Sequence, residues 1–557
     1  MKRFTFFLMT CMLLASSASA ETLPENPQLY NGSKTMQNGT VGYVSIEGGT
    51  NIYRSALSGR IIENNTVKSI GTCTSLTDET CSKANFLTYL SVLGPCENAT
   101  STDCISALDA IDANGAVLPG TIGKTFLTTK DASYSGNVTR KLPAGGQSPL
   151  VDIPGAPHEF GSKYLPIVRI TGATNPDGGN FSLHELFIRL YPVKVVQGSY
   201  NFGTELIDLN PANYAGSPTI SHDRSDDPNC VINDLTQCAV PTELPLDKKF
   251  RLTIRTSIPV PGWMHGKVAN PDISMKTVSN GYETTISANS IINPIISVQK
   301  EVNSLSADFL EPYAKALTPS SSSCDRKVIP YDLTKCTYLT LIGGYNKKDF
   351  DEFMKWLPLS GDTAFINPTI WNIIADNETK LVGGCQIDDN QLSGMVSTNA
   401  SMYLSGPPSW SASEQTLDYK VAAPHLLANK TLFQGSYDLA ISSKLARCIY
   451  KFSNAPINAT VSITSADGTP QIATTIVREA NGFLYLSAKG FTYSSPNLSV
   501  KLTGEKIQEI VQPTPSASPT TKPAASIVKK ITCVKGMSKK VLSVKSCPKG
   551  WTLKNTK

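Results

Sequence analysis

The sequence predicts a mainly β protein: two or more antiparallel β-sandwich-like domains, a short helical segment between them, and a small C-terminal disulfide hairpin. Short segments of alternating apolar and polar residues, separated by turns rich in Gly and Asn, are typical of antiparallel sheets. Charged residues make up only 17% of the 557 residues, so most exposed faces must carry neutral polar side chains. The apolar content of 40% is ordinary for a chain with packed cores.

Individual strands follow from this alternation and from the turn residues. In Phe250–Arg255 the apolar residues fall on one face, which leaves Arg251, Thr253 and Arg255 on the other. Further strands are expected at Val41–Ile46, Arg60–Ile70, Ala459–Thr464, Ile472–Arg478, Phe483–Ala488 and Leu498–Leu502. The spacing of the last four, with turns such as Ala480-Asn481-Gly482, is that of an antiparallel sandwich.

Helices are expected in fewer places. Lys83–Leu93 has the pattern of a short helix, and Glu301–Leu317 that of a longer one, kinked or split at Pro312. Asn346 opens another helix, in which the apolar residues recur at helical spacing. These residues are Phe350, Phe353, Met354 and Leu357.

The composition divides the chain into seven parts. They are a signal peptide (1–20), an N-terminal β-rich region with disulfide loops (21–150), a β-sandwich-like domain (151–300), a helical connecting segment (301–360), a second β-sandwich-like domain (361–511), a Pro/Ser/Thr linker (512–526) and a basic C-terminal hairpin module (527–557). The linker is too poor in large apolar residues to pack. In the module, Ile531–Val534 is expected to pair with Val541–Val544 across a turn at Gly536.

Twelve cysteines remain after residue 20, and most lie in pairs close together along the sequence. The predicted bonds are Cys73–Cys81, Cys96–Cys104, Cys230–Cys238, Cys324–Cys336, Cys385–Cys448 and Cys533–Cys547. Short loops closed by an even number of cysteines suit disulfides, which persist in oxidising compartments. No pair has the Cys-x-x-Cys spacing that favours zinc.

The first twenty residues are expected to be a cleaved signal peptide. Lys2 and Arg3 precede a largely apolar stretch, and Ala18-Ser19-Ala20 is a small-residue cleavage site. A lipid anchor on Cys11 is the alternative, but Thr10 does not fit the small residue required before such a cysteine. No later run is long and apolar enough to span a membrane. The sequence therefore predicts a secreted, extracellular protein, associated with the cell surface, with no transmembrane segment after signal cleavage.

Charge is distributed unevenly along the chain. The net charge is +5, but residues 512–557 hold ten lysines and no acidic residue. Without them and the signal peptide, 38 basic residues face 45 acidic ones, so residues 21–511 carry about −7. An acidic body with a basic tail points to an anionic partner for the tail.

The tail also carries a resemblance. Thr532-Cys533-Val534-Lys535-Gly536, followed by Cys547-Pro548-Lys549-Gly550-Trp551, resembles a Lys-rich module that closes many uncharacterised secreted and cell-surface proteins of aquatic actinobacteria. Asn454-Ala455-Pro456-Ile457 and Phe483–Lys489 are similar to the β-rich region of such proteins. The resemblance implies an extracellular location and a Gram-positive origin. It implies no activity, since none is established for either part.

The basic hairpin is therefore the main functional candidate. Its lysines are expected to contact polyanions of the cell wall or the membrane surface; a solvated, solubilising tail is the alternative. The proposed envelope-binding residues are Lys529, Lys530, Lys535, Lys539, Lys540, Lys545 and Lys549. Nucleic acid is not an expected partner. Proteins that bind it by stacking bases on aromatic side chains carry several such residues, whereas the module has one, Trp551.

Two residues are weaker candidates for a ligand site. Trp263 and His265 are types that line sugar-binding clefts, although an aromatic side chain packed on the sheet beside a hydrogen-bonded histidine is the favoured explanation. The main alternative function is an extracellular carbohydrate-binding or carbohydrate-active protein, which as an enzyme needs paired carboxylates in a groove, for instance near Trp263 or Trp410.

Other chemistry has little support in the sequence. There is no Gly-x-Ser-x-Gly elbow and no phosphate-binding Gly-x-x-x-x-Gly-Lys loop, and His184-Glu185 lacks the second histidine of a zinc-protease helix. Acidic turns at 222–229 and at Asp109–Gly115 are alternatively calcium loops or solvated turns. The sequence predicts no catalytic residue, no cofactor and no metal. Its eleven Asn-x-Ser/Thr sequons are glycan acceptors or chance matches.

Overall fold

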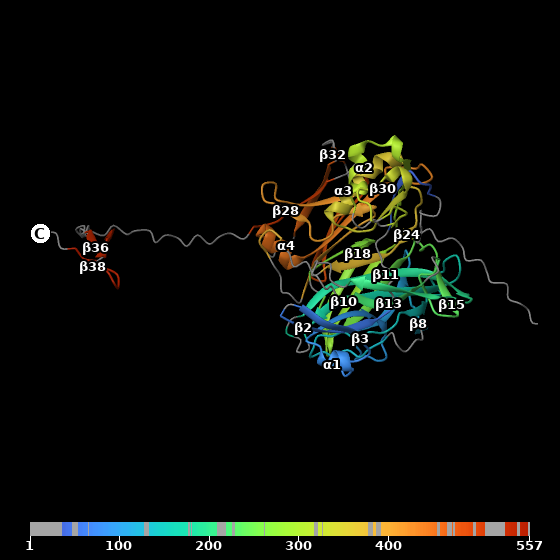
Figure 1. Ribbon diagram of the computed structural model, residues 1–557, viewed down its shortest axis with the longest axis horizontal. Coiled ribbons are helices and arrows are strands. Elements are labelled where there is room, and N and C mark those ends of the chain that lie inside the picture. The colour runs from blue at the N-terminus through green and yellow to red at the C-terminus, as the bar shows by residue number, and fades with distance from the viewer. Residues whose placement is uncertain are drawn as a thin grey trace, which may run out of the picture. The chain divides into compact units, whose positions relative to one another are not determined.

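The described parts of the chain form two compact units, Met1–Lys506 and Ile507–Lys557. The computed structural model describes residues 36–46, 54–64, 66–126, 133–175, 179, 181–208, 219–225, 229–260, 262–316, 321–325, 327–376, 382–385, 391–453, 457–464, 470–471, 474–493, 497–506, 530–542 and 546–554. The expected signal peptide and the linker at 512–526 lie outside these residues. Figure 1 shows the strands and helices of both units.

A sheet of fifteen described strands runs through the first unit. Its main path is β3 (Thr66–Cys73), β2 (Ala56–Glu63), β4 (Phe86–Val92), β10 (Lys163–Thr174), β11 (Ser182–Gln197), β25 (Asn372–Asp376), β17 (Gly262–Lys267), β26 (Leu392–Thr398), β30 (Gln434–Ser442), β34 (Phe483–Thr492) and β33 (Thr474–Ala480). Beside this path lie β8 (Thr121–Thr125), β9 (Pro149–Asp152), β14 (Ile232–Asn233) and β15 (Gln237–Pro241). We call it the central sheet.

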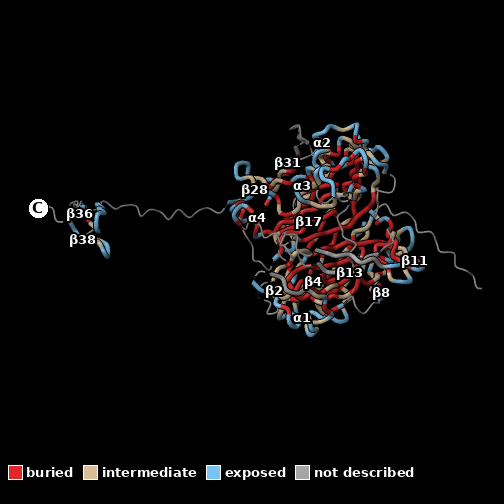
Figure 2. Tube along the Cα trace, viewed as in Figure 1, coloured by how far each residue is buried: buried red, intermediate tan, exposed pale blue. Residues whose placement is uncertain are grey.

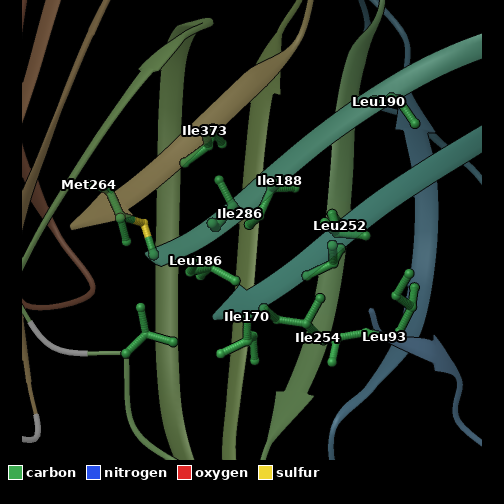
Figure 3. Packing of buried hydrophobic residues seen from close by; sticks show 14 of the residues in the cluster. Leu93, Ile170, Leu186, Ile188, Leu190, Leu252, Ile254, Met264, Ile286 and Ile373 are labelled. Atoms are coloured by element: carbon green, nitrogen blue, oxygen red, sulfur yellow. The ribbon is translucent and has the colours of Figure 1, made fainter. Parts of the chain in front are cut away.

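A second sheet, here called the lower sheet, packs on one face of the central sheet. It contains β18 (Ala269–Val278), β19 (Gly281–Asn289), β16 (Lys249–Thr256), β6 (Cys104–Ile111), β5 (Gly94–Pro95) and β7 (Val117–Leu118). Ile170, Leu186 and Ile188 of the central sheet share one core with Leu252 and Ile286 of the lower sheet. Figure 3 shows these side chains pointing between crossing strands of the two sheets.

A third sheet, the upper sheet, packs on the other face along β26, β30 and β34. It contains β27 (Met402–Tyr403), β29 (Thr416–Ala422), β35 (Asn497–Thr503), β31 (Asn458–Thr464), β32 (Pro470–Gln471) and β28 (Ser409–Ser411). Val396 and Leu439 of the central sheet share this second core with Leu417, Leu498 and Val500. Along β17, β26, β30 and β34 the central sheet is thus the middle layer of three, and most residues of β17, β26 and β30 are buried (Figure 2).

The helical segment covers a small sheet of its own. That sheet contains β21 (Ser297–Glu301), β1 (Thr40–Ser45), β23 (Thr337–Ile342) and β22 (Ser321–Ser322). The helices are η4 (Val302–Ser304), α2 (Ala307–Ala314), η5 (Leu333–Lys335), α3 (Lys347–Trp356) and η6 (Leu357–Ser360). Tyr43 stacks on Trp356 at 5.7 Å between ring centroids, so an aromatic core joins the helices to the sheet.

Local sequence explains where these helices begin. The side chain of Ser306 accepts a hydrogen bond from the backbone amide of Phe309. The side chain of Asn346 accepts one from the backbone amide of Asp349, so Ser306 and Asn346 act as N-caps. Pro312 lies inside α2 without ending it. The remaining described elements of the first unit are α1 (Glu79–Lys83), β12 (Phe202–Asp208), β13 (Thr219–Ser225), β20 (Ile291–Ile292), β24 (Thr369–Ile370) and α4 (Ser443–Tyr450).

The structure confirms the mainly β, sandwich-like class and corrects several elements. The expected helix at Lys83–Leu93 is wrong: α1 ends at Lys83, and Phe86–Val92 is the strand β4. A short, nearly continuous apolar run cannot be assigned to a helix or a strand by periodicity alone. The expected single strand Arg60–Ile70 is a hairpin, β2 and β3, which turns at Asn64 with φ of 50°.

The sheets also run across the expected boundaries at 150, 300 and 361. Strand β4 pairs with β10, and β17 pairs with β26, so segments far apart in the chain share one hydrogen-bonded ladder. The second of these pairs is parallel, as is β1 with β23, whereas the expectation was antiparallel throughout. The sandwich cores are therefore stacked on a shared central sheet within one unit.

A surface ion pair on the lower sheet gives a pH prediction. Glu283 lies 2.7 Å from Lys276 and 2.8 Å from Arg255, and the hydrogen bond from Lys276, followed by that from Arg255, lowers the pKa of Glu283. Because the folded pKa is depressed, this stabilisation is present above the ordinary glutamate pKa of about 4.3 and is lost as pH falls through the folded value.

Glu283→Gln is therefore expected to cost about 1 kcal/mol or less at pH 7, because Lys276 is solvent-exposed, and almost nothing at pH 3. Urea unfolding of both proteins at the two pH values measures this. Glu414→Gln, at an exposed turn position between β28 and β29, is the control and should cost the same at both. A Glu283→Gln cost that does not shrink at pH 3 would contradict the ion-pair account.

Candidate functional site

The second unit is a small three-stranded sheet in the order β37 (Ser538–Leu542), β36 (Ile531–Lys535) and β38 (Thr552–Leu553). The expected hairpin is present, with Ile531 opposite Leu542 and Val534 opposite Lys539. Gly536 has φ of 58° in the tight turn, a left-handed conformation that glycine adopts without strain. The third strand was not predicted, because a strand of two residues is too short to show the alternation of apolar and polar side chains.

The disulfide Cys533–Cys547 holds this sheet together. Cys533 is fully buried in the central strand, whereas β37 and β38 are mostly exposed. A two-stranded hairpin is marginal in water, and a small unit with so little core needs a covalent staple. The bond therefore gives the exposed side chains of this unit a defined arrangement.

Lysines lie on both faces of the sheet. Lys540 is opposite Cys533, whereas Lys539 is opposite Val534, so their side chains point to different faces. Five of the proposed lysines are exposed: Lys530, Lys535, Lys539, Lys540 and Lys549. Lys554, which is not in the proposed set, is exposed as well. Lys529 and Lys545 lie outside the described residues.

Nothing acidic balances this charge within the C-terminal module at 527–557. Residues 527–557 contain nine lysines and no Asp or Glu. Lys540 lies 5.4 Å from the ring centroid of Trp551, a cation–π contact that holds the ammonium group at the surface. The described part of this unit therefore presents its positive charge to solvent.

All six disulfides join the cysteines that the spacing pairs. Five of them close loops with sequence separations of 8 to 14 residues, and Cys385–Cys448 spans 63. Six such bonds fit an extracellular protein. No helix within the described ranges combines the length and apolar character needed to cross a bilayer.

Trp263 and His265 do not line a ligand site. Each is only 1% exposed on β17 of the central sheet, and Trp263 belongs to the core that this sheet shares with the upper sheet. His265 Nδ1 lies 2.9 Å from the hydroxyl of Tyr403, and the imidazole packs edge-on against Tyr345 at 5.1 Å. These contacts make both residues part of the core, where sequence alone could not place them.

One cavity does bring two carboxylates together. A space of about 190 Å³ is lined by Asp272 and Asp438, with Lys249 and Arg478 beside them. Burial raises the pKa of Asp438. For Asp272, burial opposes ionisation, but hydrogen bonds and charges from Lys249 and Arg478 outweigh it and lower the pKa. Opposite shifts of this kind occur in acid–base pairs.

The contacts of these carboxylates are structural. Asp438 accepts a hydrogen bond from the amide of Asn270 at 2.9 Å, where β18 bulges, and Asp272 pairs with Lys249 at 3.0 Å and with Arg478. The space is also smaller than the roughly 300 Å³ at which ligand pockets begin. The pair holds β18 to the central sheet.

The described acidic turn at Asp109–Gly115 has internal partners too. Asp109 lies 2.7 Å from Arg251, and Asp112 accepts hydrogen bonds from the amides of Asn114 and Ala116. The side chains of the turn at 222–229, except that of Asn229, lie outside the described residues. In the part of the chain that the structure describes, no three Asp, Glu, His or Cys side chains gather closely enough to hold a metal ion.

These features define a class: a disulfide-stapled, mainly β protein with a separate, basic C-terminal unit. Comparison with family models, curated proteins and solved structures finds no match to this chain. Its function must therefore be argued from its own surfaces.

Proposed function

We propose that this protein is a secreted, cell-envelope-associated structural or binding protein whose C-terminal unit contacts anionic envelope polymers. The observation that supports the proposal most is the cross-linked hairpin with exposed lysines on both faces and no acidic residue. The body of the chain carries the opposite charge. Retention by the tail would keep an acidic body at a surface that would otherwise repel it.

The arrangement of the lysines favours a flexible polymer over a flat surface. Lys539 and Lys540 point to opposite faces, so a planar bilayer can meet only part of the charge at once. A flexible polyanion chain can pass around the small hairpin module at 527–557 and contact both faces. Wall polymers with phosphate or carboxylate groups are thus the preferred partner, and anionic lipid is the competing one.

The test uses the full chain in the cells that export it. Deleting residues 512–557 is expected to move most of the protein from the cell fraction to the medium. A second variant keeps the disulfide and replaces Lys535, Lys539, Lys540 and Lys549 with Gln, which should have nearly the same effect. The matched control replaces four exposed lysines of the first unit with Gln: Lys163, Lys327, Lys348 and Lys444.

The control is expected to remain in the cell fraction, because it loses as much charge from a different place. Binding of the purified proteins to vesicles of phosphatidylglycerol and to soluble poly(glycerol phosphate) then separates lipid from polymer. Stronger binding to vesicles than to the polymer would shift the proposal to lipid. Retention of the deletion variant at the parental level would overturn anchoring by the tail.

A further inference from the structure

A lysine is buried at the end of β17, and the proposed function makes no use of it. Lys267 is only 2% exposed, although lysine is almost never fully buried without groups that accept its hydrogen bonds. Its Nζ donates to Oδ1 of Asn293 and to the main-chain carbonyl of Ser401, both at 2.8 Å. Asn293 and Ser401 are buried as well, and both of these acceptors are uncharged.

The fold fixes the positions of this amine and this side-chain amide. Lys267 is the last residue of a strand that pairs with β25 and β26. The main-chain amide of Asn293 donates to the carbonyl of Pro368 at 2.8 Å. The hydroxyl of Ser401 donates to the carbonyl of Pro294 at 2.6 Å. The two side chains are therefore held next to each other by contacts from several separate parts of the chain.

The amine also lies close to the carbon of the Asn293 amide. Cγ is bonded to Oδ1 at about 1.2 Å, so it is at most about 4 Å from Nζ of Lys267. Nucleophilic attack needs a separation of about 3 to 3.5 Å, so a shift of about 1 Å or less brings the two atoms to that distance. The fold thus places a nucleophile and an amide at close range within one molecule.

The residue after Asn293 blocks the usual competing reaction of an asparagine side chain. In that reaction the main-chain nitrogen of the next residue attacks the side-chain amide, which closes an imide ring and releases ammonia. Here the next residue is Pro294, whose ring nitrogen carries no hydrogen. Loss of ammonia at this position therefore points to attack by the lysine.

We propose that Lys267 and Asn293 form an intramolecular amide cross-link. The neutral amine attacks Cγ, so the bond between Nζ and Cγ forms and the bond between Cγ and Nδ2 breaks. The proton that Nζ gives up leaves with Nδ2 as ammonia, and the step needs no oxidant, reductant or cofactor. The product replaces a buried amine, which is costly to keep charged in a protein interior, with a neutral amide. It joins β17 to the segment between β20 and β21.

The surface of the same unit contains a matched pair of residues. Nζ of Lys489 lies 2.5 Å from Oδ1 of Asn270, which also precedes a proline. Asn270 is exposed, so this pair is open to water, which stabilises a charged ammonium group. A charged ammonium group is not a nucleophile. This pair is therefore expected to stay unlinked, and it serves as an internal control.

Tryptic peptide mapping of the purified full chain, with its disulfides reduced, tests the proposal. An amide on Nζ prevents cleavage after Lys267, so residues 256–276 should appear joined to residues 277–300. The joined product should be lighter by one ammonia than the sum of the two peptides. Cleavage after Lys489 should be complete, as expected for an unmodified lysine.

Two variants complete the test. Lys267→Met keeps a side chain of similar length without the nucleophile, and Asn293→Ala removes the amide. Both should yield residues 277–300 as an unlinked peptide, and Asn293→Ala should restore cleavage after Lys267. Recovery of residues 256–267 and 277–300 as separate, unmodified peptides from the folded parent would overturn the proposal. The parent chain alone decides this, whether or not a variant folds.

The result is independent of the proposed function. Deleting residues 512–557 is expected to leave the cross-link in place, because Lys267 and Asn293 both lie in the first unit. A chain that is released from the cell fraction but still cross-linked would separate the two proposals.

Discussion

Replacing Trp263 with Ala is expected to lower the free energy of unfolding of the first unit by about 3 to 5 kcal/mol, the range for deleting a large buried aromatic side chain. The indole is 1% exposed and packs where the central sheet meets the upper sheet. Gly394 on the neighbouring strand leaves room for it, since an added Cβ there would lie 2.4 Å from Cζ3 of the ring. The tight packing on both sides leaves little freedom for the cavity to collapse.

Trp263→Phe is the matched control for this substitution. The indole Nε1 is buried and has no hydrogen-bond partner among the described residues, so phenylalanine removes volume without removing a hydrogen bond. It should cost less than half as much as alanine. Urea unfolding monitored by circular dichroism gives both values. A cost below 1 kcal/mol for Trp263→Ala would place this side chain outside the core and restore it as a ligand-site candidate.

Removing the Cys385–Cys448 bond is the second change with a large expected effect. This bond spans 63 residues, and in the loop-entropy model such a bond stabilises the folded state by about 4 kcal/mol. A double Cys→Ala variant should therefore lower the free energy of unfolding by about that amount. The same change at Cys96–Cys104, with a separation of 8, should cost only about 2.5 kcal/mol.

The two double variants differ in one further respect. Cys385 and Cys448 join the turn that carries Gly383 to α4, so their loss should also loosen the packing of Trp410 against Tyr450. The Cys96–Cys104 bond clamps a loop of the lower sheet and should leave this packing unchanged. Equal stability losses in the two variants would show that loop length does not govern what these bonds contribute.

The features that could be predicted from the sequence are the local ones. Five disulfides close short loops, so the spacing of the cysteines along the chain was sufficient to pair them. Phe250–Arg255 was predicted because one face of β16 is covered and the other is partly exposed, which produces clean alternation. The caps at Ser306 and Asn346 likewise depend on residues three positions apart.

The layering could not be predicted in the same way. Strands of the central sheet such as β17 are buried on both faces, so their sequences do not show which face meets which sheet. Trp263 and His265 stayed weak ligand-site candidates because their neighbours are distant in the chain: Tyr403, which contacts His265, is about 140 positions away. Because these neighbours are far away in the sequence, the sequence alone does not show that the two residues are buried.

The interrupted edge of the upper sheet beside Trp410 was hidden for a similar reason. It depends on β29 meeting β27 and β28 on one side and β35, some eighty residues later, on the other. The sequence signal that could have suggested it is the pair Pro407-Pro408 between two short strands, because such a pair must interrupt an edge. In the C-terminal unit, by contrast, composition alone identified the charge, and the fold added its distribution over both faces.

The salt dependence of polyanion binding tests the proposed function most directly. The association constant of the full chain for soluble poly(glycerol phosphate) is measured from 50 to 500 mM salt, beside the variant with Lys535, Lys539, Lys540 and Lys549 changed to Gln. The plot of log K against log salt should fall steeply for the parent and by roughly 0.7 to 0.9 less per lysine lost from contact in the variant. Equal slopes for the two proteins would contradict the account.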